Sequence, residues 1–291
     1  MKLSKVSVIG IGVGAIAIAA YVGINMYASR VAEAKVNEFI DDIDDEMIIE
    51  YGNVSANPFK SDVVIKDIRV APIEAPEDTI NVARVVIREL ENGDEFPTVL
   101  DASAYGIDFS DEQVAPPAFY SFLQQASYDQ LPLFNLDTKY EYQASSGKVV
   151  LETLRFGADD FGYLETTFEL GNVDPDATSN EALTLHAAEI TYRDDSFAEK
   201  LFASMAAQSN QDVAQFKTQL QANLSQSAQF FVSSEDTVAM TALEETMAFI
   251  ENPKGFSISV DPQQPVSMRL LSSASNPADW AELLNLKIES Y

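Results

Sequence analysis

The sequence predicts an α+β protein: an N-terminal transmembrane helix, then a body made of a large curved antiparallel β-sheet with a C-terminal cluster of helices. Three observations lead to this prediction. An uncharged apolar run occupies residues 6–28, and alternating apolar and polar residues recur from residue 47 to residue 192. Helical spacing of apolar residues then dominates from about 195 to 252.

Residues 1–29 are expected to form a membrane anchor. The run Val6–Ala28 is long enough to cross the hydrocarbon core of a bilayer as a helix. Two lysines precede it, and basic residues favour the cytoplasmic side, so the rest of the chain is expected outside the cytoplasm. Small-residue patterns at Ala17–Ala19 and Ala32–Ala34 leave cleavage of this segment as an alternative.

The anchor also carries glycines at two informative spacings. Gly10, Gly12 and Ala15 match the G-x-G-x-x-G/A spacing of dinucleotide-binding domains. That interpretation is rejected, because the following run has no polar face and residues 32–42 are helical in pattern where a second strand should lie. Gly10 and Gly14 instead give a G-x-x-x-G face, which lets two membrane helices pack closely and is a candidate helix contact.

Residues 30–46 are predicted to continue as an amphipathic stalk helix. Apolar residues from Val36 to Ile43 repeat at helical spacing, with acidic residues on the other face. The acidic cluster Asp41–Asp45 lacks the glycine turn and the distal glutamate of an EF-hand calcium loop. It is therefore interpreted as a solvated face.

Residues 47–291 are predicted to form one β-rich extracytoplasmic domain. Strand patterns cover residues 49–54, 61–70, 79–90, 102–109, 139–143, 149–156, 163–170, 182–192, 256–260, 266–270 and 284–288. A short helix with an aromatic face is expected at 119–126. Ser145–Lys148 fits the S-x-x-K motif of penicillin-recognising enzymes, but it lies between two strand patterns, so a hairpin turn is predicted.

Three helices are predicted within the insertion at about 195–252. Ser196 and Glu199 fit a capping box for the first of them. The second contains Val213 to Leu224. The third begins near Ser234 and ends at Asn252, which precedes a proline.

Composition restricts the chemistry. The chain has 46 acidic and 18 basic residues, a formal net charge of −28, which argues against nucleic acid as a partner. Such a surface fits saline surroundings or a cationic partner. Cysteine is absent, and His186 is the single histidine, which leaves no thiolate site or multi-histidine metal site. The pairs Asp159-Asp160 and Asp194-Asp195 could suggest a hydrolase, but they look like turn or cap residues. We expect no enzyme, cofactor or metal site.

Several stretches support a family resemblance. They are the opening Met1–Lys5 with its apolar run, IIEYGNVSANPFKSDVVIKDIRV at 48–70, ITYRDDSFAEKLFASMAAQSN at 190–210 and AFIENPKGFSISVDPQQPVS at 248–267. With these the chain resembles the YdgA-like family of bacterial inner-membrane-anchored envelope proteins. More distantly it is similar to the AsmA-like proteins, which are implicated in lipid movement between membranes. The resemblance implies a single-pass inner-membrane protein with a periplasmic domain, and it supplies no catalytic residues.

Two functions follow as hypotheses. In the first, the protein binds a lipid, another hydrophobic ligand or a protein partner on the apolar face of the curved sheet, without catalysis. The expected lining, each member of which also fits an ordinary core, is Tyr105, Ile107, Phe109, Phe119, Phe122, Tyr140, Tyr142 and Phe168. In the second, it is an accessory or scaffold subunit of a membrane assembly, with contacts through Gly10, Gly14 and the acidic surface. In both, residues 6–28 contact the lipid bilayer.

Overall fold

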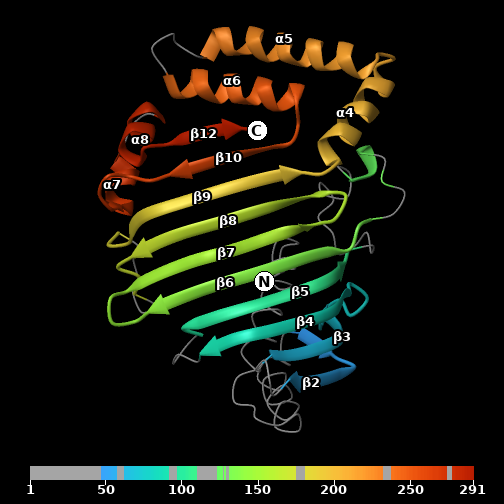
Figure 1. Cartoon of the computed structure of the whole chain (residues 1–291), viewed down its shortest axis with the longest axis vertical. Coiled ribbons are helices and arrows are strands. Elements are labelled where there is room, and N and C mark those ends of the chain that lie inside the picture. The colour runs from blue at the N-terminus through green and yellow to red at the C-terminus, as the bar shows by residue number, and fades with distance from the viewer. Residues whose placement is uncertain are drawn as a thin grey trace. The chain divides into compact units, whose positions relative to one another are not determined.

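The computed structural model describes residues 47–57, 62–91, 97–109, 123–126, 128, 131–174, 181–231, 237–273 and 277–291. They form an α+β fold that is mostly antiparallel sheet with additional helices, which confirms the predicted fold class at this level (Figure 1). The chain divides into two compact units. The N-terminal unit comprises Met1–Gln124, Tyr128–Tyr142 and Glu152–Ala158, and the C-terminal unit comprises Gln125–Ser127, Gln143–Leu151 and Asp159–Tyr291.

The predicted anchor at 1–29, with Gly10 and Gly14, and the predicted stalk at 30–46 lie outside the described residues. In the ranges that the structure does describe, no helix combines the length and the apolar character needed to cross a membrane.

The N-terminal unit is built from antiparallel strands that follow one another in the chain. They are β1 (Met47–Glu50), β2 (Asn53–Asn57), β3 (Asp62–Pro72), β4 (Ile80–Glu91), β5 (Val99–Asp108) and β6 (Phe134–Gln143). β3 pairs with β4, β4 with β5 and β5 with β6, and both β1 and β2 pair with the other edge of β3. The single strand predicted at 49–54 is therefore two strands, interrupted at Tyr51 and Gly52.

A crease crosses three neighbouring strands of this unit. Inward positions are spaced by three residues instead of two around Asp67 in β3, Ala83 in β4 and Gly106 in β5. β4 has a second such step, from Ile87 to Leu90. Asp67 and Gly106 have positive φ angles of 55° and 67°. Ala83 belongs to β4, which pairs with β3 on one side and with β5 on the other. The register shift at Gly106 against β6 is a β-bulge. Each strand thus reverses which of its side chains face inward at the crease.

The core of the N-terminal unit lies on one face of its strands. Ile65, Val85, Leu100 and Phe134 are among its most deeply buried side chains. Phe134 stacks on Phe156 with ring centroids 5.1 Å apart. Burial of these branched and aromatic side chains accounts for the alternating pattern that predicted the strands.

The C-terminal unit contains the remaining strands and the helices. The strands are β8 (Gly162–Gly171), β9 (Thr184–Asp194), β10 (Gly255–Val260), β11 (Val266–Ser267) and β12 (Lys287–Ser290), and β7 (Lys148–Ala158) is divided between the two units. The helices are α4 (Phe197–Gln208), α5 (Val213–Phe231), α6 (Thr237–Glu251), α7 (Met268–Ser273) and α8 (Pro277–Leu284). β9 pairs with β8, β10 and β11, and β10 pairs with β12.

The three predicted helices are α4, α5 and α6, and they share a small core. Ala198, Phe202 and Ile250 are buried in it, and Phe216 and Leu220 of α5 pack against them. Figure 1 shows α5 running alongside α6. Helical spacing therefore predicted the inward side chains of α5 from Phe216 onward. It was wrong for Met205 of α4 and for Val213, each of which is 38 % exposed.

Three local predictions have a clear outcome. Ser145–Gly147 lie in the turn between β6 and β7, and Gly147 has a φ of 60°, which confirms a turn in place of an S-x-x-K active site. The strand predicted at 266–270 is wrong beyond Ser267, because Met268 begins α7. The predicted capping box is also wrong, since the side chain of Ser196 makes no capping hydrogen bond to α4.

Candidate functional site

The C-terminal unit has a sheet with one polar and one apolar face. On the polar face, Glu165 of β8 pairs with Thr191 of β9, which pairs with Ser257 of β10. On the other face, Thr166 pairs with Ile190, which pairs with Ile258. Paired residues in antiparallel strands project from the same side, so aliphatic side chains gather across β8, β9 and β10.

This apolar face, called the β8–β10 face, is defined by Leu164, Phe168, Ile190, Ile258 and Val260. Leu164 is 45 % exposed, Ile190 43 % and Ile258 37 %. Phe168 and Val260 are half-buried and both pair with Ala188. An antiparallel sheet normally covers its apolar face, so neighbouring exposed aliphatic residues mark a contact surface.

An aromatic cluster closes one end of the β8–β10 face. Tyr192 pairs with Leu164 of β8 and Phe256 of β10. Its ring lies 5.7 Å from that of Phe256 and 6.3 Å from that of Phe249 on α6. α6 therefore covers β9 and β10 at this end, while Leu164 of β8 stays exposed beside Tyr192.

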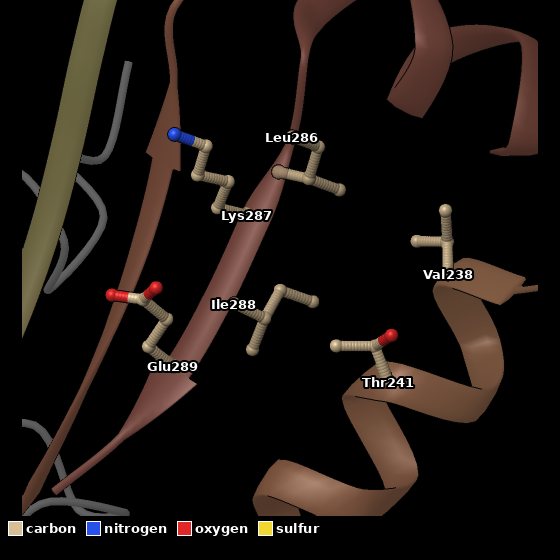
Figure 2. Close-up of a pocket in the computed structure, with 6 residues that line it drawn as sticks. All are labelled: Val238, Thr241, Leu286, Lys287, Ile288 and Glu289. Atoms are coloured by element: carbon tan, nitrogen blue, oxygen red, sulfur yellow. The ribbon is translucent and has the colours of Figure 1, made fainter.

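The apolar row continues toward a groove beside α6. Ile258 pairs with Ile288 of β12, which lines a groove of about 290 Å³ together with Val238, Thr241 and Leu286. Figure 2 shows Leu286 and Ile288 pointing toward α6, while Lys287 and Glu289 point the opposite way. The volume lies just below the range for small-molecule sites, roughly 300–1,000 Å³, so the groove suits the end of a ligand and not a whole one.

A side chain of α6 holds the edge strand that forms this groove. Glu245 accepts hydrogen bonds from the backbone N–H of Ser290 at 2.7 Å and from the Ser290 hydroxyl at 2.6 Å. These bonds lower the pKa of Glu245 below its ordinary value. An outward N–H of the edge strand is thereby satisfied, which fixes α6 beside β12.

The predicted lining residues do not form one surface. Ile107 and Phe109 are buried in the core of the N-terminal unit, where the Phe109 ring lies 5.7 Å from that of Phe134. Tyr105 projects from the opposite face, because the bulge at Gly106 separates it from Ile107. Phe119 and Phe122 lie outside the described residues.

Tyr140 and Tyr142 lie on the core side of β6 by alternation with Phe134. Tyr140 pairs with buried Leu100, and its hydroxyl donates to the carbonyl of Pro97 at 2.8 Å. Burial raises the pKa of this hydroxyl. Among the lining residues that the structure describes, Phe168 is thus the one that lies on the β8–β10 face.

The aspartates of the two candidate hydrolase pairs serve in turns and at a helix start. Asp159 and Asp160 form the turn between β7 and β8, where Asp160 has a φ of 62°. Asp194 accepts hydrogen bonds from Tyr192 and from the first turn of α4. Among the described residues, no group of three His, Cys, Asp or Glu side chains is arranged to hold a metal ion.

The sequence alone did not identify Leu164, Ile190 or Ile258. Each sits in an ordinary alternating strand, and alternation does not say which apolar face the rest of the protein leaves uncovered. The sequence does show mostly apolar residues at every second position in each of the three strands. These positions can be recognised as one surface only when the pairing register of the strands is known.

A family model described as "Uncharacterized protein" matches residues 155–290. That stretch contains β8 to β12 and α4 to α8, and therefore the whole β8–β10 face. No curated protein matches the chain.

Proposed function

We propose that this protein is a non-enzymatic binding protein of the bacterial inner membrane that holds the acyl chain of a lipid on the β8–β10 face. The observation that carries the proposal is the row of exposed aliphatic residues on adjacent strands, Leu164, Ile190 and Ile258. The anchor at residues 1–29, the periplasmic location and kinship with the YdgA-like family belong to the same proposal. They rest on the apolar run and on the resemblance described above.

The chemistry of the β8–β10 face favours an acyl chain as its occupant. The side chains that define it are aliphatic apart from Phe168, and none is charged. A flexible hydrocarbon gains from contact with such a strip without hydrogen-bonding partners. The row leads through Ile258 and Ile288 to the groove beside α6, which offers a place for the chain end.

The hydrolase hypothesis receives no support from the acidic pairs. Asp159 and Asp160 are used in a turn, and Asp194 is used at the start of α4. Glycosidases instead need two carboxyl groups facing one another across a cleft. Binding without catalysis is therefore the function we propose.

The test uses the full-length chain purified from native membranes. Mass spectrometry should detect co-purifying lipid, and a fatty acid with an environment-sensitive fluorophore should bind and brighten. Ile190→Asn should weaken binding of this probe by roughly tenfold or more, because it removes one buried aliphatic side chain from the contact. Thr167→Asn, on the opposite face of β8, is the matched control and should leave binding unchanged.

The outcomes separate lipid from other occupants. Absence of lipid together with equal probe binding by both variants would reject the proposal. A protein crosslinked to the β8–β10 face in place of lipid would reassign the same surface to a protein partner. Thermal unfolding of both variants shows whether each retains its fold.

A further inference from the structure

A row of hydrogen-bond donors crosses the N-terminal unit on the face opposite its core. Asn53 of β2 pairs with Lys66 of β3, Lys66 with Arg84 of β4, Arg84 with Tyr105 of β5, and Tyr105 with Asn135 of β6. Because paired residues share a face, all five side chains project from the same side. We call this set the cationic row.

The cationic row is unusual for this protein. The chain carries 46 acidic and 18 basic residues, yet the row has two cations and no carboxylate. Lys66 and Arg84 are directly opposite one another, an arrangement of like charges that destabilises a sheet. In the part of the chain that the structure describes, neither of them forms an ion pair.

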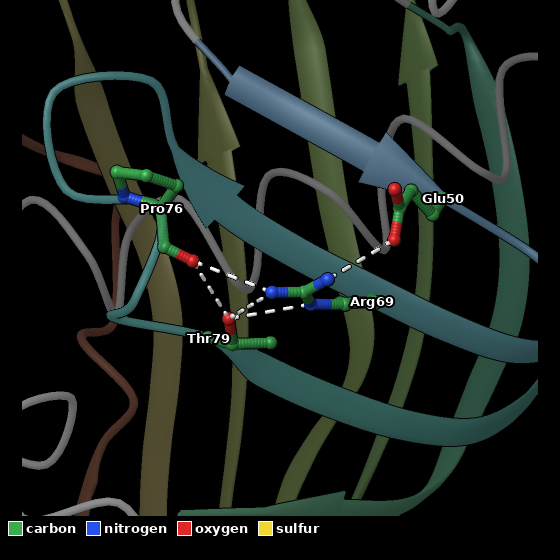
Figure 3. A network of polar contacts seen from close by, with 4 residues as sticks. All are labelled: Glu50, Arg69, Pro76 and Thr79. Atoms are coloured by element: carbon green, nitrogen blue, oxygen red, sulfur yellow. Dashed lines mark hydrogen bonds and ion pairs between the residues drawn. The ribbon is translucent and has the colours of Figure 1, made fainter.

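Nearby cations are used differently. Arg69 donates to Glu50 at 3.3 Å, and also to Thr79 and to the carbonyl of Pro76, as Figure 3 shows. All three guanidinium nitrogens of Arg69 therefore donate to residues of β1 or of the segment that connects β3 to β4. Arg69 is therefore accounted for by the fold, in contrast to Lys66 and Arg84.

Arg88, on the other side of the cationic row, is also occupied. It donates to Asp101 at 2.8 Å, to the buried Ser103 hydroxyl at 2.8 Å and to the Tyr105 hydroxyl at 3.3 Å. Ser103 in turn donates to Asp137 at 2.5 Å. Asp101 is thus paired with Arg88 and Asp137 accepts from Ser103, and neither carboxylate forms an ion pair with Lys66 or Arg84.

The row is also pre-organised. The Arg84 guanidinium lies over the Tyr105 ring, 4.4 Å from its centroid, which holds it along the sheet surface. The amide oxygen of Asn135 accepts the backbone N–H of Gly106 at 3.2 Å, so its nitrogen is left as a donor. The Lys66 ammonium and the planar Arg84 guanidinium lie on neighbouring strands, where both can donate to the oxygens of one phosphate group.

We propose that the cationic row binds a phosphate group, carried either by a lipid head group or by a small soluble phosphate. Lys66 and Arg84 supply the charge, and Tyr105 positions Arg84. The site lies wholly in the N-terminal unit and does not depend on acyl-chain binding by the β8–β10 face.

Calorimetry with the full-length chain at low ionic strength tests this site. The probes are inorganic phosphate and glycerophosphoglycerol, the soluble diester of a phospholipid head group. The double variant Lys66→Gln/Arg84→Gln should weaken binding at least about tenfold, since it removes two charge-assisted contacts. Arg84→Lys should show an intermediate loss, because it keeps the charge but loses the planar donors.

The matched control is Lys254→Gln/Arg269→Gln, which removes the same charge from exposed positions of the C-terminal unit and should bind like the parent. Diester binding without phosphate binding identifies a lipid-type ligand, and the reverse identifies free phosphate. Failure of both probes to bind, or an equal loss in the control, overturns the proposal. Since all four substituted residues are exposed, thermal unfolding should match the parent.

Discussion

At the scale of single residues, Asp194 does the work that the sequence assigned to Ser196. Its Oδ1 accepts the backbone N–H of Ala198 at 2.9 Å and the hydroxyl of Tyr192 at 2.5 Å. Ser196 instead donates to the carbonyl of Asp160 in the β7–β8 turn. A helix is capped by whichever acceptor reaches the free backbone N–H groups of its first turn. Here that acceptor is Asp194, because it is the last residue of β9 and lies next to the start of α4.

The charge of Asp194 opposes folding to a small extent. Burial raises the pKa of this carboxyl above its ordinary value, although the two hydrogen bonds act to lower it. A carboxyl whose folded pKa is raised contributes its stability fully below the unfolded pKa. That contribution is lost as the pH rises through the folded pKa. Because the group is half exposed, solvent reduces the effect.

Asp194→Asn should therefore be neutral or slightly stabilising at pH 7, since an amide oxygen still accepts both hydrogen bonds. Its free energy of unfolding should approach that of the parent as the pH falls to 4. Asp194→Ala, which removes the cap, should lose about 1 kcal/mol. Urea unfolding at both pH values measures this, and an Asn variant less stable than the Ala variant would contradict the assignment.

At the scale of elements, the crease in the N-terminal unit depends on Gly106. Its φ of 67° is unfavourable for residues with a side chain, and an added Cβ would lie 2.8 Å from the Cβ of Ala83. Two separate costs thus disfavour any other residue here. One is the backbone conformation, and the other is the close approach of β4.

Gly106→Ala should lower the free energy of unfolding by roughly 1–2 kcal/mol from the backbone conformation alone, with a further loss from the contact. Combining it with Ala83→Gly should recover the second part, because that change removes the opposing methyl group. A double-mutant cycle by urea unfolding separates the two. Strict additivity of the two changes would show that the contact with Ala83 costs nothing.

Most elements were predictable from local patterns, and the crease was not. β3, β4, β8 and β9 appear near the residues where alternation predicted them, because a half-buried strand needs period two. α4, α5 and α6 follow from apolar residues at helical spacing. The change in spacing of inward residues at Asp67, Ala83 and Gly106 can be recognised only when the three strands are aligned in their pairing register.

At the scale of the whole molecule, charge repulsion should dominate the response to salt. The formal net charge is −28, and a folded chain concentrates that charge more than an unfolded one does. Added salt screens repulsion beyond about 10 Å at 0.1 M ionic strength. The folded state should therefore gain stability as salt is added.

We expect the melting temperature to rise by several degrees between 0.01 M and 0.3 M sodium chloride and to level off above that concentration. Scanning calorimetry over this range of sodium chloride concentration checks this. A melting temperature that is independent of salt, or that falls, would mean that local ion pairs such as Arg88–Asp101 outweigh the general repulsion.

The sequence predicted an apolar sheet face as the candidate site, but not which residues form it. Alternating strands indicated a sheet with an apolar face, but of the six predicted lining residues that the structure describes, Phe168 alone lies on the β8–β10 face. Ile107 and Phe109 are core residues of the N-terminal unit. Their large apolar side chains are equally suited to a core and to a binding surface, so residue type does not separate the two uses.

By itself, the sequence determined the class of the fold and the positions of most strands and helices, because those depend on spacing within a few neighbouring residues. Only the tertiary structure decided which side of a sheet each residue occupies and which residues of distant strands become neighbours. One bulge residue at Gly106 sends Tyr105 to the opposite face from Ile107. Strand register then joins Leu164, Ile190 and Ile258 into a single surface, since pairing brings together residues that local pattern cannot connect.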